Sequence, residues 1–191
     1  MPHMREIEIK ARVADKAALL AILKAQNISV SEPITHHDRV FGLDGEDGGG
    51  VNAAPWLRIR TEISAGKKSE IFTLKKSITN QMDSIEHETE VTDVAELEKI
   101  ILHIGFTPYS DLTKTRQKAH RGDIEICIDT IEGLGDFIEV EKLTSEDVDY
   151  KHIAEELWAV LESFGVSRDD HVTDGYDVLM RKYEGSTVSA R

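Results

Sequence analysis

The sequence contains little cysteine and no long apolar run. Cys127 is its single cysteine, so no disulfide can form within the chain. No stretch approaches the roughly 20 apolar residues that a membrane-spanning helix needs, and no signal peptide is recognisable at the start. These features argue against a disulfide-stabilised secreted scaffold and against a membrane partner. We expect a cytoplasmic protein.

Basic residues are scarce relative to acidic ones. Lys and Arg number 23 against 36 Asp and Glu, which gives a formal net charge of -13. A protein of this charge repels a phosphate backbone, so we do not expect it to bind nucleic acid. The Gly48-Gly49-Gly50 run also lacks the Lys and the Ser or Thr that complete a phosphate-binding loop, so residues 42–55 are expected to link two strands.

Charged residues instead occupy alternate positions of β-like segments. Because strand side chains alternate between two faces, Glu6, Glu8 and Lys10 would lie opposite Ile7 and Ile9. A single strand of this kind is typical of a half-solvated sheet. The pattern recurs, however, at Arg58 and Arg60, at Lys75, at Glu86, Glu88 and Glu90, at Lys114, Arg116 and Lys118, at Asp123, Glu125 and Asp129, and at Glu139 and Glu141. We therefore expect the charged faces to line a common interior in which acids and bases compensate one another.

Apolar residues at helical spacing predict helices that cover the other face of the sheet. One stripe contains Leu19 and Leu23, a second contains Leu97 and Ile101, and a third runs from Ile153 to Phe164. A short fourth helix is expected around residues 174–183. Together these patterns predict an α+β fold: an antiparallel, eight-stranded, closed or nearly closed β-barrel with helices packed outside. Residues 1–183 would form one domain, and residues 184–191 a disordered tail.

The charged motifs, in their order along nearly the whole chain, resemble those of the CYTH superfamily, the triphosphate tunnel metalloenzymes. Glu6-x-Glu8-x-Lys10 resembles its E-x-E-x-K signature, Leu57-Arg58-Ile59-Arg60 its L-R-x-R strand, and Thr73-Leu74-Lys75 its T-x-K strand. Later segments resemble its remaining motifs: Lys114-Thr115-Arg116, Asp129, the segment 135–141 with Glu139 and Glu141, and Tyr176-Asp177-Val178-Leu179. The chain departs from the family with Val40 in place of an aromatic residue and with Lys76 in place of a glycine.

The resemblance implies a set of site residues. The substrate-binding cations would be Lys10, Arg58, Arg60, Lys75, Lys114 and Arg116, and the catalytic residues Lys10, Lys75, Lys114 and Asp129. A triphosphate carries about four negative charges, which several fixed cations and Arg forks can bind. The metal ligands for Mg²⁺ or Mn²⁺ would be Glu6, Glu8, Glu139 and Glu141, because these hard cations prefer carboxylate oxygens. The acids of the run Glu86, Glu88 and Glu90 are expected to pair with the basic residues instead.

The resemblance implies a metal-dependent enzyme that acts on a triphosphate, with class IV adenylyl cyclase activity, from ATP to cyclic AMP and pyrophosphate, as the first expectation. Two alternatives stay open: an inorganic or thiamine triphosphatase of the same fold, and a module that binds polyphosphate or a nucleotide without turnover. A homodimer is a further expectation. No motif reads the base or the thiamine, so the sequence does not predict which triphosphate is the substrate.

Overall fold

Eight antiparallel strands close into a barrel in the computed structural model, which describes residues 5–43, 54–145 and 147–189. The strands are β1 (Arg5–Val13), β2 (Ile34–Leu43), β3 (Trp56–Ser64), β4 (Lys67–Asn80), β5 (Asp83–Glu90), β6 (Phe106–Arg121), β7 (Ile124–Ile131) and β8 (Gly135–Thr144), with a two-residue β9 (His171–Val172). The helices are α1 (Lys16–Ala25), α2 (Val94–His103), α3 (Tyr150–Ser163) and α4 (Tyr176–Ser189). Most of the linker expected at 42–55 lies outside the described residues.

The barrel closes between its first and fifth strands. The strand order is β5-β4-β3-β2-β6-β7-β8-β1, and β1 also pairs with β5 at residues Arg5 to Ile7. Arg5 reinforces this seam, since its guanidinium donates to both carboxylate oxygens of Asp83, at 2.5 and 2.8 Å, and to the carbonyl of Val148 at 2.9 Å. The expected α+β fold with a closed eight-stranded barrel is therefore confirmed.

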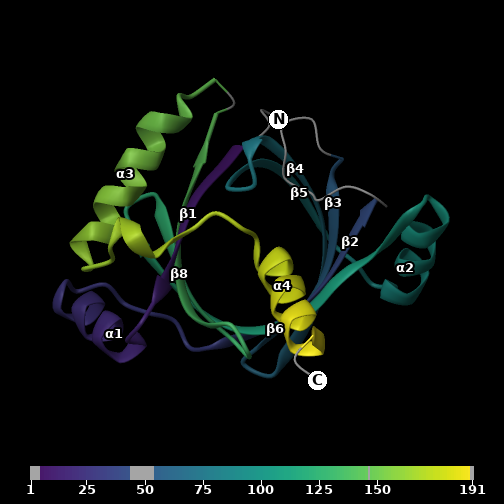
Figure 1. Cartoon of the computed structure of the whole chain (residues 1–191), viewed down its shortest axis with the longest axis horizontal. Coiled ribbons are helices and arrows are strands. Elements are labelled where there is room, and N and C mark those ends of the chain that lie inside the picture. Colours follow the sequence, from purple (N-terminus) through teal and green to yellow (C-terminus); the bar gives the residue numbers. More distant parts are fainter. Residues whose placement is uncertain (1–4, 44–53, 146, 190–191) are drawn as a thin grey trace.

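Alternation along the strands puts apolar side chains on the outer face of the barrel. Ile7 and Ile9 of β1 pack there with Ile126 of β7 and Val140 of β8, all at most 1% exposed. Helices α1 and α3 cover this face, and Figure 1 shows both outside β1 and β8. The polar residues between these positions therefore point into the barrel.

Helix α2 covers a second part of the outer face. Its Ile101 is 1% exposed and packs with Phe41, Leu57 and Ile59 of β2 and β3. The helix begins after Asp93, whose carboxylate accepts a hydrogen bond from the backbone N–H of Glu96 and so caps the first turn. This packing covers the outer face of the two strands whose inner faces carry Asp38, Arg58 and Arg60.

Helix α4 lies over one end of the barrel, in front of its interior in Figure 1. Its Tyr176 packs with Leu112 and Phe137, which share the inner faces of β6 and β8 with the charged residues. The helix continues to Ser189, into the segment expected to be a disordered tail, because no proline interrupts it. The 3₁₀ turn Arg168–Asp170 and β9 have three and two residues, which are too few to show a periodicity in the sequence. In the ranges that the structure describes, no helix has both the length and the apolar character needed to cross a membrane.

Candidate active site

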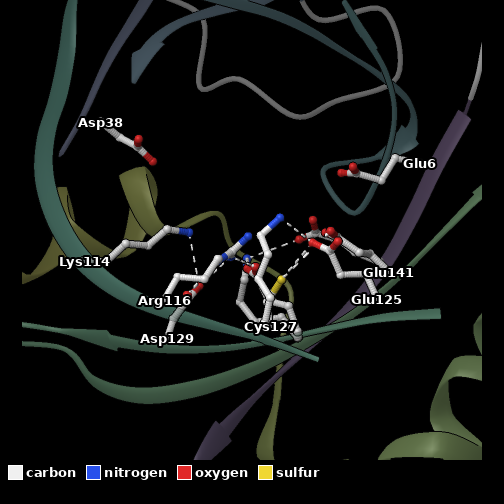
Figure 2. A network of polar contacts seen from close by, with 12 residues as sticks. Glu6, Asp38, Lys114, Arg116, Glu125, Cys127, Asp129 and Glu141 are labelled. Atoms are coloured by element: carbon white, nitrogen blue, oxygen red, sulfur yellow. Dashed lines mark hydrogen bonds and ion pairs between the residues drawn. The ribbon is translucent and has the colours of Figure 1, made fainter. Parts of the chain in front are cut away.

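The charged residues singled out by the sequence line a single cavity of about 240 Å³ inside the barrel. Those assigned to the site come from five strands, β1, β3, β4, β6 and β8, and the cavity-lining members are Glu6, Glu8, Lys10, Arg58, Arg60, Lys75, Lys114, Arg116, Glu139 and Glu141. Asp129 lies behind Lys114 and Arg116 and its side chain is fully buried. Figure 2 shows Glu6, Glu125 and Glu141 on one side of this network, and Asp38, Lys114 and Asp129 on the other.

Buried carboxylates hold the cations on the basic side. Asp129 accepts hydrogen bonds from Arg116 Nε at 2.7 Å and from Lys114 Nζ at 3.1 Å. Asp38 accepts a forked pair from Arg60 at 2.7 and 2.8 Å. Burial opposes the ionisation of Asp38, but the charge and hydrogen bonds of Arg60 outweigh it and hold the pKa of this carboxyl well below its usual value. The basic side is therefore ionised and preorganised for an anion.

Two acids of β5, Glu86 and Glu88, pair with cations of β3 and β4 as predicted, whereas the pairing predicted for the exposed Glu90 is not found among the described residues. Glu86 accepts from Lys75 Nζ at 2.6 Å, and Glu88 accepts from Arg58 Nη2 at 3.2 Å. Arg58 also donates to the hydroxyl of Thr73 at 3.2 Å. These contacts fix the positions of Arg58 and Lys75 on the wall of the cavity while leaving part of each side chain accessible.

Three carboxylates gather on another part of the wall, where Lys75 Nζ lies 3.2 Å from Glu6 and Lys10 Nζ lies 3.4 Å from Glu8. One oxygen from each of Glu6, Glu8 and Glu141 lies within 4.8 Å of the other two. Burial raises the pKa of Glu6 to about 7; Lys75 opposes this shift, whereas Glu86 and Glu8 add to it. Burial and the charge of Glu6 raise the pKa of Glu141 well above its ordinary value. Carboxyl groups that oppose one another's ionisation can bind a divalent cation, because the cation neutralises their repulsion and is coordinated by their oxygens.

Glu139, predicted as a fourth metal ligand, lies apart from this trio. It pairs with Lys10 Nζ at 3.2 Å and forms a short ion pair with Arg116. Burial opposes its ionisation, but Arg116 and Lys10 outweigh that effect and lower the pKa of Glu139 to about 2. Its carboxylate is therefore ionised between two cations, and its assignment as a metal ligand stays a prediction.

Several residues without a role predicted from the sequence lie in or beside the cavity. Glu125 and Cys127 each offer one ligand atom within 4.8 Å of Glu141. Cys127 donates to a Glu125 oxygen at 3.4 Å, and burial raises the pKa of its thiol. Glu125 was identified on the charged face of its strand, but alternation alone does not show which acids meet. Asp38 and Tyr176 also line the cavity.

The arrangement can bind a polyanion on one side and a divalent cation on the other. Arg and Lys side chains supply donors for phosphate oxygens, and the Glu6, Glu8 and Glu141 oxygens supply hard ligands. Both groups face the same enclosed space, so an anion and a metal would meet there.

Known proteins are similar to this chain both in sequence and in fold. A model of the CYTH domain family matches residues 4–176. A protein of Methanocaldococcus jannaschii named "putative adenylate cyclase" is 28% identical over 175 residues, which are 91% of this chain and 97% of that protein.

Solved structures agree in fold. A Pyrococcus horikoshii protein matches with a TM-score of 0.77 at 24% identity, over 93% of this chain and 99% of its own. A Hippeastrum protein, described as a "putative adenylyl cyclase" with a dominant triphosphatase activity, matches with a TM-score of 0.55 at 16% identity, over 89% of this chain and 91% of its own. Because the family model extends over almost all of the sequence and the barrel has the same form, the chain belongs to the CYTH domain family.

Proposed function

We propose that this protein is a metal-dependent enzyme that converts ATP to cyclic AMP and pyrophosphate inside its barrel. The observation that carries the proposal is one cavity lined by six cations and by the close trio of Glu6, Glu8 and Glu141. The name of the Methanocaldococcus jannaschii relative supports the cyclase reaction. A cytoplasmic location and a homodimer stay predictions of the sequence.

Arginine and lysine side chains bind the phosphates in this proposal. Arg58, Arg60 and Arg116 present planar forks to phosphate oxygens, and the three lysines add point charges. All six are held by carboxylates, so they need no large rearrangement before a phosphate arrives. A cavity of about 240 Å³ is smaller than the ~300–1,000 Å³ of a typical ligand pocket, so it would take the phosphate chain while the nucleoside extends beyond it.

Glu6, Glu8 and Glu141 would hold Mg²⁺ or Mn²⁺, with Glu139 as the further ligand predicted from the sequence. When bound, a divalent cation would neutralise phosphate charge and activate the attacking oxygen. The fit rests on the three converging carboxylate oxygens; burial, with repulsion between neighbouring carboxylates, raises the pKa of Glu6 and of Glu141.

The chain's own residues would then position the reacting groups. The ribose 3′ hydroxyl gives its proton to solvent water and its oxygen forms a bond to the α-phosphorus, while the bond from that phosphorus to the pyrophosphate oxygen breaks. Lys10, Lys75 and Lys114 would stabilise the charge that develops on the phosphate oxygens, and Asp129 would position Lys114 and Arg116. In phosphoryl and nucleotidyl transfer such positioning and charge stabilisation account for most of the catalysis.

A triphosphatase is the second candidate, and the activity described for the Hippeastrum protein favours it. In that reaction water attacks the terminal phosphorus, and the same cations and carboxylates would serve. A module that binds polyphosphate without turnover is the third candidate. It has no need for three carboxylates converging within 4.8 Å, so it ranks below the two enzymes.

The test is a product assay with ATP, tripolyphosphate and thiamine triphosphate, each with Mg²⁺ and with Mn²⁺. Cyclic AMP from ATP supports the cyclase, whereas phosphate without cyclic AMP defeats it and favours the hydrolase. Lys75→Ala should abolish turnover, and Lys99→Ala, an exposed lysine on α2, should leave it unchanged. Tight binding without turnover or metal dependence, unaffected by Glu6→Ala, would leave only the binding module.

A further inference from the structure

The C-terminal segment returns to the cavity and places a phenol ring among its charges. Tyr176, the first residue of α4, is 8% exposed and lines the cavity. The ammonium group of Lys10 lies 4.4 Å from the centre of its ring, and that of Lys114 lies 4.7 Å from the same point. Two cations on one ring are held there by its negative π face, so the ring helps to place both lysines.

The hydroxyl group of this tyrosine is buried and has no hydrogen-bond partner among the residues that the structure describes. A buried polar group without a partner is costly and rare in native proteins. Burial raises the pKa of Tyr176 well above its usual value, and the nearby Glu139 and Asp129 add to the shift. The phenol therefore keeps its proton, and its O–H is a donor that no described residue uses.

We propose that Tyr176 binds the triphosphate directly, its phenol O–H donating to a phosphate oxygen held between the ammonium groups of Lys10 and Lys114. Both ammonium groups lie within 4.7 Å of the ring centre, so an oxygen that they share lies beside the same ring. A hydrogen bond to a charged oxygen is stronger than one between neutral groups. The inference rests on the proposed function and adds Tyr176 to the substrate-binding residues.

Contacts next to the tyrosine hold it in this position. Lys10 Nζ donates to the carbonyl of Asp174 at 3.3 Å, and the backbone N–H of Gly175 donates to Gln81 Oε1 at 2.8 Å. The phenol ring also packs edge-on against Phe137, with 5.1 Å between ring centres. The segment before α4 thus belongs to the wall of the cavity, and the site is incomplete without it.

Tyr176→Phe tests the proposal, because it keeps the ring under both lysines and removes only the hydroxyl group. Without ligand, this variant should melt at the wild-type temperature or higher, since the hydroxyl has no partner to lose. Its dissociation constant for inorganic tripolyphosphate, measured by calorimetry, should rise about tenfold, as expected for the loss of one hydrogen bond to a charged group. The matched control is Tyr150→Phe, at the first residue of α3 outside the barrel, which should bind as the wild type does.

Ultraviolet difference spectra supply a second measurement that does not depend on affinity. Saturating tripolyphosphate should shift the tyrosine absorption of the wild type and of Tyr150→Phe, and the shift should be absent from Tyr176→Phe. Wild-type affinity in Tyr176→Phe, or a loss of stability in its ligand-free form, overturns this inference alone. Failure of the wild-type protein to bind tripolyphosphate overturns the proposed function as well, so the two failures can be told apart.

Discussion

Replacing Asp129 with Asn should destabilise the protein strongly, because this carboxylate is the shared partner of two buried cations. Its side chain is fully buried, Arg116 donates to both of its oxygens at 2.7 and 2.5 Å, and Lys114 donates at 3.1 Å. The amide that replaces it carries no charge and presents an NH₂ group to one of these donors. Arg116 would keep Glu139 as a partner, but Lys114 would lose its only ion pair within the described part of the chain.

The expected loss is about 3–5 kcal/mol, the usual cost of removing one member of a buried ion pair. For a chain of 191 residues, each kcal/mol corresponds to about 2–4 °C in melting temperature, so the midpoint should fall by roughly 6–20 °C. Tripolyphosphate should restore part of the loss, because it replaces the missing negative charge and binds only the folded state.

Urea unfolding at pH 7 measures this loss, with Asp123→Asn as the matched control. The Asp123 side chain is 73% exposed and pairs with Lys142 at 3.1 Å, so its substitution should change stability by less than about 0.5 kcal/mol. Equal losses in the two variants would show that the buried network does not hold the barrel together, and would refute the reasoning.

The same pair of proteins tests the pH dependence. Burial opposes the ionisation of Asp129, but the charges of Lys114 and Arg116 outweigh it and hold its pKa below the usual value. Ionised Asp129 therefore adds its full contribution to the free energy of unfolding above the unfolded-state pKa of about 3.9. This contribution is lost as the pH falls toward the folded-state pKa. The wild type and Asp129→Asn should accordingly converge in stability below about pH 4.

Three further predictions concern the core, the metal ligands and a buried imidazole. Leu157→Ala in α3 should cost about 2–5 kcal/mol in urea unfolding, whereas Leu102→Ala, 44% exposed, should cost far less; similar losses would contradict the assigned core. Glu8→Gln should abolish the rise in melting temperature that Mn²⁺ gives the wild type, whereas exposed Glu96→Gln should keep it; a full rise in Glu8→Gln would remove Glu8 from the metal site. Burial, reinforced by nearby cations, lowers the pKa of His36 to about 2. The stability of the wild type should therefore fall as the pH drops below about 6.5, by ~2 kcal/mol at pH 5, and His36→Gln should lack this loss. The same pH profile of stability in His36→Gln as in the wild type would refute the assignment.

The alternation of charged and apolar residues was enough to predict which side chains enter the barrel. Glu6, Glu8 and Lys10 lie inside, and Ile7 and Ile9 pack outside, because successive strand residues point to opposite faces whatever the sheet around them. The recurrence of this pattern on nearly every strand also predicted closure, since so many charged faces needed a common interior. These conclusions depend only on local geometry and on the cost of burying unpaired charge.

Strand register decided which of these charges meet, and the sequence does not encode register in any local pattern. Glu141 lies opposite Glu8 and so joins the carboxylate trio, whereas Glu139 lies opposite Lys10 and becomes an ion-pair partner. A shift of two residues would bring Glu139 opposite Glu8 and Phe137 opposite Lys10, while leaving the inward face of β8 unchanged. The position of Tyr176 was likewise beyond the sequence, because it depends on how the chain after α3 returns across one end of the barrel, through contacts between residues more than 90 positions apart.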